Sequence, residues 1–203
     1  QLVSSTDGAL TNTGGWPVSH SNWIQALASD ADGYIYSGSQ ANIVRKIAPD
    51  GIEVTSGGWP FTGHTNTVRA LAVDTDGYLY SVSSDDTVRK IAPDGNQVTS
   101  GGWPFTGHTG AVYGVAVDAD GYIYSAGVDD TVRKIAPNGI EVTSGGWPFT
   151  GHTDYVSDIA VDADGYIYSA DAYGVAKKIN ANGNRVWSKD YGSALRAIAV
   201  TAN

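Results

Sequence analysis

The amino-acid sequence repeats itself with a period of 44 residues, and this period restricts the fold more than any other feature. The nonapeptide GGWPFTGHT stands at residues 57–65, 101–109 and 145–153, and Trp16 precedes Trp59 by 43 residues. Residues 57–100 and 101–144 are identical at 31 of 44 positions, so consecutive units must adopt the same local structure. Periods of about 20–50 residues are typical of repeat arrays, in which each unit buries its apolar face against its neighbours.

Each unit contains four strand-like runs that are separated by turns. In the second unit these runs are Val68–Val73, Tyr78–Ser81, Thr87–Ile91 and Gln97–Thr99. Alternating apolar, aromatic and β-branched residues favour strands, whereas Asp-x-Asp-Gly and Pro-Asp-Gly mark turns. Four short antiparallel strands in every repeat describe one blade of a β-propeller. The sequence therefore predicts an all-β protein.

One stretch of the second unit, GHTNTVRALAVDTDGYLYSVSSDDTVRKI, resembles the WD40 repeat. Gly63-His64 stand at the Gly-His of that repeat, Val73–Gly77 at its pre-turn segment, and Asp85 and Thr87 at its Asp-x-Thr turn. Residues 117–139 are also similar to the NHL and PQQ-like propeller repeats. The resemblance covers essentially the whole chain and is specific for the fold far more than for the function.

The WD40 resemblance also implies hydrogen bonds inside the blades. It implies that His64 bonds Asp85 and that His108 bonds Asp129, both in a structural role. The Trp-Asp pair of the family is replaced by Ile-Ala at residues 47–48, 91–92 and 135–136, so the family's His–Asp–Ser/Thr–Trp network cannot be complete. The first unit has Ala41 and the fourth has Tyr173 at the position of Asp85.

We predict one domain over residues 1–203, a β-propeller of five blades with about four antiparallel strands each. The repeat units span about 16–58, 59–102, 103–146 and 147–186, and the inner-strand pattern occurs a fifth time at Leu195–Val200. Residues 1–15 align with the last strands of a unit, so residues 1–15 and 187–203 are expected to form the closing blade. The Tyr-x-Tyr strand occurs only four times, which leaves this blade short by one strand. Two alternatives remain open: the chain is a segment of a longer array, or another subunit meets the open edge.

The aromatic residues of the repeated segment have two interpretations. In the first, Trp and Phe lie on the outermost strand and pack against the next blade, where burial of each contributes about 2–3 kcal/mol. In the second, they surround the ring and bind sugars, as the tachylectin-like lectins, which are small repeat propellers, hold glycans between blades. The candidate ligand-binding residues are Trp16, Trp23, Trp59, Phe61, Trp103, Phe105, Trp147 and Phe149.

The remaining polar motifs are expected to be structural. Asp-x-Asp-Gly occurs at 30–33, 74–77, 118–121 and 162–165, but the further acidic positions of a calcium loop are absent, so we predict turns without metal or cofactor. The Arg-Lys pairs at 45–46, 89–90 and 133–134, with the pair at 177–178, are expected to bond turn aspartates. The four histidines occupy equivalent repeat positions and no nucleophile elbow, metal-binding His motif or phosphate loop occurs, so the sequence does not indicate an enzyme.

Charge and composition narrow the partners. A net charge of -9 argues against binding of nucleic acid or of anionic lipid. No apolar run approaches the roughly 20 residues of a membrane helix. The absence of cysteine removes disulfides and thiolate sites, and the start at Gln1 in a chain without methionine favours a processed product that is secreted.

The combined expectation is a non-enzymatic recognition or assembly propeller outside the cell or on a particle surface. The first hypothesis is a multivalent binding module for carbohydrate or for a protein surface, because a repeated site suits binding better than chemistry. The alternative is a structural subunit of a filament, appendage or viral tail that self-associates through its incomplete terminal blade, because an open strand edge can pair with another chain.

Overall fold

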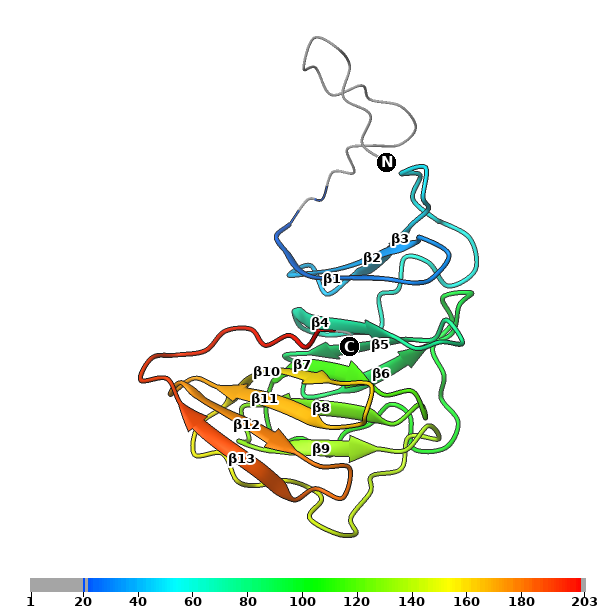
Figure 1. Ribbon diagram of the computed structural model, residues 1–203. Helices are drawn as coiled ribbons and strands as arrows, with labels where there is room; N and C mark the ends of the chain where they lie inside the picture. Colours follow the sequence, from blue (N-terminus) through cyan, green and yellow to red (C-terminus); the bar gives the residue numbers. More distant parts are fainter. Residues whose placement is uncertain (1–19, 21, 202–203) are drawn as a thin grey trace.

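The computed structural model describes residue 20 and residues 22–201, and these residues form thirteen strands in four antiparallel sheets (Figure 1). The described part of the chain contains no helix, and hence none that could span a membrane. The first three sheets have three strands each and the fourth has four. The strands are β1 (Ile24–Ser29), β2 (Ile35–Ser39) and β3 (Val44–Ile47) in the first sheet, β4 (Val68–Val73), β5 (Leu79–Ser83) and β6 (Val88–Ile91) in the second, β7 (Val112–Val117), β8 (Ile123–Gly127) and β9 (Val132–Ile135) in the third, and β10 (Val156–Val161), β11 (Ile167–Asp171), β12 (Val175–Ile179) and β13 (Arg185–Asp190) in the fourth.

The sheets stand one after another in chain order and pack through their first strands. β1 lies against β4, β4 against β7 and β7 against β10, from the top to the lower part of Figure 1. This arrangement confirms the all-β prediction and is consistent with a β-propeller. The described residues hold four of the predicted blades, and the segment 1–15 that was assigned to the fifth lies outside them. The number of five blades therefore stays a prediction.

The core lies between consecutive sheets, where the second strand of each sheet is most deeply buried. All five residues of β5 are buried, and Tyr80 in its centre has no exposed surface. The central strand β5 has strands on both sides and sheets on both faces. Little space is left for polar side chains, so its polar positions other than Tyr80 are serines. We call the region between two consecutive sheets a junction.

The fourth strand of the first three sheets is reduced to two isolated bridges. In the second sheet Ile91 pairs with Gln97 and Val88 pairs with Phe105, and the residues between these bridges leave the sheet edge. They leave it to meet the next sheet: the Gly102 amide donates to the Asn138 carbonyl at 2.9 Å. A Cβ at position 102 would lie 2.2 Å from the carbonyl oxygen of Gly139, so only glycine allows this backbone approach. The fourth sheet lacks this loop, and there β13 is continuous.

The predicted strand at Leu195–Val200 is not a strand in the structure, and this expectation was wrong. Residues 191–201 instead run back along the β10 edge of the fourth sheet, as Figure 1 shows. A first strand needs hydrogen bonds from the second strand of its own sheet, as β4 has from β5. No such partner strand for this segment occurs among the described residues.

Candidate binding surfaces

The repeated Trp and Phe side chains form the junctions. Trp103 is 5% exposed, its ring centroid lies 5.7 Å from that of Tyr80, and its indole N–H donates to the Pro137 carbonyl of the next sheet at 3.3 Å. Phe105 is also buried and meets the edge of His108 at 6.1 Å between ring centroids. One aromatic ring thus joins its own sheet to the backbone of the next.

All six of these aromatic residues are buried at equivalent positions. Their exposures lie between 4% and 7%, so no ring face is free to stack on a sugar. The packing interpretation accounts for these residues: Trp59, Phe61, Trp103, Phe105, Trp147 and Phe149. Of the two other candidate ligand-binding residues, Trp23 is 75% exposed and Trp16 lies outside the described residues.

A lysine lies beside the same rings at each junction. The Lys90 ammonium lies 4.2 Å from the Tyr78 ring centroid and 5.3 Å from that of Tyr80, and donates to the Pro137 carbonyl at 3.4 Å. Burial lowers the pKa of Lys90, and the nearby Asp74 and Asp76 carboxylates partly offset this effect. The cation–π contacts fill the aromatic site from within, so an external cation has no place there. The expected ion pairs with turn aspartates are present for Arg89 with Asp85 at 4.0 Å, Arg133 with Asp129 at 3.4 Å and Lys178 with Asp162 at 3.8 Å, whereas Lys90 lies mainly against the tyrosine rings.

The predicted His–Asp contacts are present in the second and third sheets. His64 Nδ1 donates to Asp85 Oδ2 at 2.9 Å, and its Nε2 accepts from Ser81 Oγ at 2.8 Å. His108 bonds Asp129 at 3.0 Å in the same way. The ring of His64 is fully buried, which agrees with a structural role.

The fourth sheet builds the same contact with a different residue. Its residue at the Asp85 position is Tyr173, which is 67% exposed, and the acid has moved to Asp171, which is fully buried. His152 Nδ1 donates to Asp171 Oδ2 at 2.8 Å and its Nε2 accepts from Ser169 Oγ at 2.7 Å. Sequence reasoning did not assign Asp171, although an Asp two positions earlier, at the end of β11, was a visible signal.

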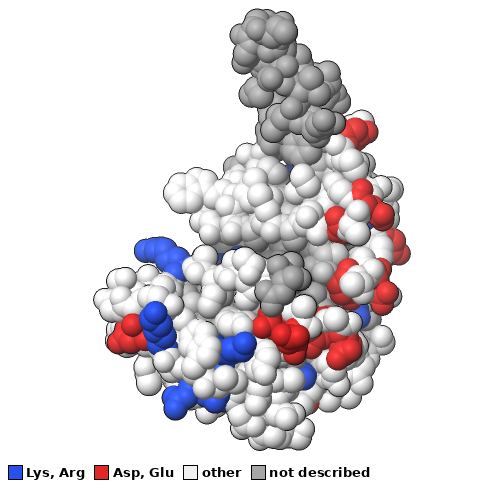
Figure 2. Space-filling model, viewed as in Figure 1, with Lys and Arg blue, Asp and Glu red and all other residues white. Residues whose placement is uncertain are grey.

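The Asp-x-Asp-Gly segments are turns. Asp74 Oδ1 accepts from the amides of Asp76 and Tyr78, and Oδ2 accepts from the Tyr80 hydroxyl at 2.9 Å. Within residues 20 and 22–201 no group of three or more His, Asp or Glu side chains could hold a metal ion. Figure 2 shows that acidic side chains gather along the right-hand edge, where these turns lie.

A shallow pocket opens at the junction of the second and third sheets. Its volume is about 270 Å³, and its lining includes Tyr78, Lys90, Ser100, Trp103 and Asn138. The corresponding positions of the first junction carry Tyr, Lys, Ser and Trp as well, with Asp94 in place of Asn138. The residue types that line this pocket are therefore repeated at the first junction.

The opposite end of the sheets is where the repeats differ. Of the 13 positions that differ between residues 57–100 and 101–144, seven are 66, 67, 69, 70, 82, 83 and 84 of the second unit. The pairing of Val68 with Ser83 and of Ala70 with Val82 brings these positions together at one end of β4 and β5. We call this surface the variable end; its side chains include Trp23, Gln25, Arg69, Ser84, Tyr113, Val128, Tyr155 and Tyr173.

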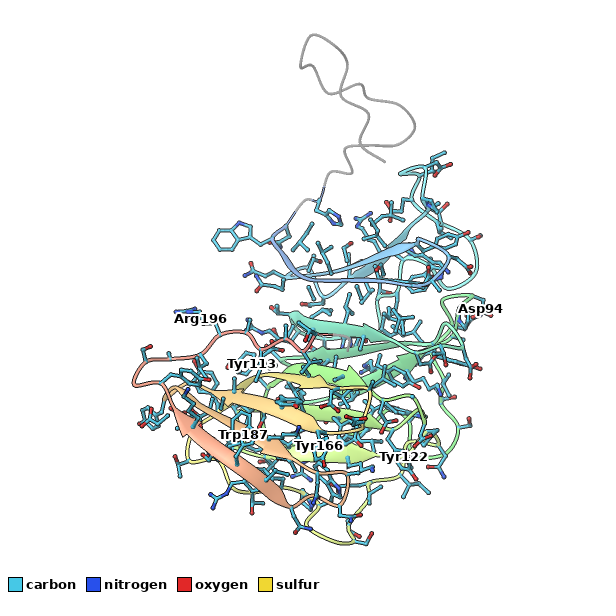
Figure 3. All side chains as sticks on the ribbon, in the orientation of Figure 1. Asp94, Tyr113, Tyr122, Tyr166, Trp187 and Arg196 are labelled. Carbon is cyan, nitrogen blue, oxygen red and sulfur yellow. The ribbon has the colours of Figure 1, made fainter. Side chains whose placement is uncertain are left out.

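A β-bulge in each first strand presents a side chain at the variable end. The register shifts between Val68 and Ala70 and, in the third sheet, between Val112 and Gly114, so Arg69 and Tyr113 are the extra residues. A bulge leaves its extra residue outside the regular ladder and re-aims its side chain. Figure 3 shows Tyr113 at the left of the view and Asp94 at the right, at opposite ends of the sheets.

The bulge residues of the second and third sheets pack on one another, and the row continues to Tyr155 just before β10. The Arg69 guanidinium lies 5.1 Å from the Tyr113 ring centroid, and the Tyr113 ring lies 5.6 Å from that of Tyr155. This row spans the second, third and fourth sheets. Tyr155 is 39% exposed, and Val128, which follows β8, is 41% exposed. The variable end therefore offers aromatic and arginine side chains to solvent.

The repeated antiparallel sheets pack through their first strands, and three of the four contain a buried His bonded to Ser and Asp, which is consistent with a repeat protein of the β-propeller class. The model of the family WD domain, G-beta repeat, matches residues 58–91 and 103–134. These two stretches of the chain are similar to the WD40 repeat, which supports the WD40-like resemblance predicted from the sequence. No curated protein matches it. WD40 repeats are propeller-type modules for protein interaction.

Proposed function

We propose that this chain is a non-enzymatic recognition module that binds a protein partner through the variable end. The observation that supports the proposal is the row of contacting side chains Arg69, Tyr113 and Tyr155. Aromatic and arginine side chains are enriched where protein interfaces contribute most of their binding energy. The rest of each unit is nearly invariant because it builds the junctions, whereas this surface differs from sheet to sheet.

A displayed-peptide library that is selected on the intact chain tests this function. The double variant Tyr113→Ala/Tyr155→Ala should weaken the selected ligands by more than about tenfold, since hot-spot truncations cost about 2 kcal/mol or more. The matched control is Asp94→Ala, which removes a fully exposed side chain at the opposite end. Selected ligands whose affinity is unchanged by the double variant but is reduced by Asp94→Ala would contradict the proposal.

Multivalent carbohydrate binding is a second candidate, and the pocket at the junction of the second and third sheets supports it. Tyr78, Ser100 and Asn138 offer an aromatic ring beside hydroxyl and amide groups, which suits a sugar. A glycan array that is probed with the wild type and with Asn138→Ala tests it, and sugar binding that is unchanged in the variant would rule out this pocket.

The secreted location stays a prediction that a localisation experiment on the native protein can check.

A further inference from the structure

The outer edge of the fourth sheet is the continuous strand β13, whereas isolated bridges form the outer edge of each other sheet. In those sheets a Gly-Gly pair, such as Gly145-Gly146, follows the first bridge and leads the chain to the next sheet. Lys189 and Asp190 have these two positions in the fourth sheet, and they pair with Ala176 and Val175. All six residues of β13 are exposed, and within residues 22–201 no strand pairs with its outer side (Figure 1). Such an edge presents backbone N–H and C=O groups to which another strand can add.

The outer strand of the fourth sheet also has the opposite charge at one repeated position. In each of the first three sheets an Arg of the third strand donates a hydrogen bond to a Glu or Gln at the first bridge of the outer edge. The pairs are Arg45 with Glu53 at 2.6 Å, Arg89 with Gln97 at 2.7 Å and Arg133 with Glu141 at 2.7 Å. In the fourth sheet Lys177 has the position of the Arg, and Arg185 has the position of the acceptor. Burial lowers the pKa of Lys177, Asp171 partly offsets this effect, and the positive charge of Arg185 lowers the pKa further. Two cations therefore lie where the other sheets have a cation and its acceptor.

Two cations of β13, Arg185 and Lys189, lie in no ion pair with any residue that the structure describes. Lys177 has a carboxylate of its own sheet, that of Asp171, at 4.0 Å, and the Lys189 ammonium lies 4.9 Å from the Tyr191 ring centroid. Figure 2 shows Lys and Arg side chains over the fourth sheet, at the lower left, whereas acidic side chains gather along the right-hand edge. In a chain with a net charge of -9, this edge is therefore a local cationic surface.

The charge of the edge decides between two occupants. A second copy that paired through its own β13 would bring Arg185 and Lys189 toward the same two cations, and like charges on paired strands are destabilising. An acidic strand meets no such repulsion and supplies beside Arg185 the carboxylate that Glu141 supplies in the third sheet. We propose that an acidic, extended segment of a partner protein adds to β13 as a further strand, with a carboxylate beside Arg185. Backbone hydrogen bonds then supply affinity and the charged side chains supply specificity. This edge is separate from the variable end, so the proposal does not depend on the function proposed above.

Binding of a synthetic peptide to the intact chain tests the proposal. The probe is a fluorescein-labelled peptide of alternating Glu and Val, and the comparison peptide has Gln at every Glu position. The chain should bind the Gln peptide at least about fivefold more weakly than the Glu peptide, which is the effect of one exposed ion pair. Fluorescence anisotropy measures both affinities. Hydrogen exchange of the β13 amides should slow in the complex, because an added strand accepts hydrogen bonds from some of them. A Glu peptide that shows no saturable binding, or that binds no more tightly than the Gln peptide, would overturn the proposal.

Arg185→Glu separates this edge from the overall charge of the protein. The variant places a carboxylate beside Lys177, as Glu141 lies beside Arg133, so the sheet should stay folded. It should bind the Glu peptide at least about fivefold more weakly than the wild type and should bind a peptide of alternating Lys and Val instead. Arg196→Glu is the matched control, because it makes the same change of charge at an exposed residue outside β13.

Three results would refute the proposal. The first is an Arg185→Glu variant that keeps its affinity for the Glu peptide, or loses no more of it than Arg196→Glu does. The second is exchange of the β13 amides that is unchanged in the complex. The third is a dimer of the chain alone, by light scattering, in which the β13 amides are protected, because a second copy would then occupy the edge.

Discussion

Replacement of Trp103 by Ala tests whether the repeated aromatic residues hold the sheets together. An aromatic side chain buries about 150–250 Å², which at about 25 cal/mol per Å² gives about 4–6 kcal/mol. Trp103 is 95% buried by the exposure above and also donates a hydrogen bond to Pro137, so nearly all of this area is lost. Measured replacements of buried aromatic residues by Ala cost about 3–5 kcal/mol, and we expect Trp103→Ala in that range.

Urea unfolding followed by circular dichroism measures this loss. Trp103→Phe keeps a ring against Tyr80 but cannot donate to Pro137, so its cost should be smaller. Trp23→Ala is the matched control, because Trp23 is 75% exposed and its loss should change the unfolding free energy by less than about 0.5 kcal/mol. A Trp103→Ala variant within 1 kcal/mol of the wild type by this assay, or a Trp23→Ala variant equally destabilised, would refute the structural role.

Three further substitutions test single polar contacts. Burial alone would raise the pKa of Asp85, but hydrogen bonds from His64 and other donors hold it below its usual range. The Asp85 carboxylate therefore stabilises the fold above its unfolded pKa of about 4, and this effect is lost as the pH falls. Asp85→Asn should lower the unfolding free energy by about 1–3 kcal/mol at pH 7 and by less in acid. Urea unfolding at each pH measures the difference. Burial raises the pKa of Asp158, so its charge opposes folding once the pH rises through that pKa. Asp158→Asn can still accept the hydrogen bond from the Ile198 amide, so this variant should be more stable than wild type at pH 7 and equal to it in acid. A variant that is less stable than wild type at pH 7 would contradict this prediction. Tyr80→Phe removes the donor to Asp74 and should cost about 0.5–1.5 kcal/mol, with an unchanged urea midpoint as the opposing result.

The strands of each unit could be predicted from the sequence because local patterns determine them. Val68–Val73 was expected as a strand and is β4, with alternation ended by an Asp-x-Asp-Gly turn. The fourth run was harder, since Gln97 and Phe105 bridge the sheet only singly. The residues between these two bridges leave the sheet edge because the Gly102 amide donates a hydrogen bond to the next sheet. A contact with another sheet produces no periodic pattern in the sequence of residues 97–105, so it could not be predicted.

The junction contacts were predictable in kind but not in every residue. His64 and Asp85 follow from their positions in the repeat, because the same pair recurs with the same spacing. Asp171 does not, since it lies in β11 itself and not in the following turn. Its role depends on how close two strands bring a carboxylate to His152, which is a matter of tertiary distance and not of sequence spacing.

The variable end could not be found by looking for repeated residues, because repetition identifies the opposite kind of position. A junction residue such as Trp103 contacts its own sheet and the backbone of the next, so any change in it disturbs two units. A bulge residue such as Arg69 or Tyr113 lies outside the ladder and can change without loss of pairing. In a chain built of near-identical units, the positions that differ are those that the fold does not constrain. Because seven of the 13 differing positions gather at one end, which also carries aromatic side chains in contact, we proposed that end as the surface for specific binding.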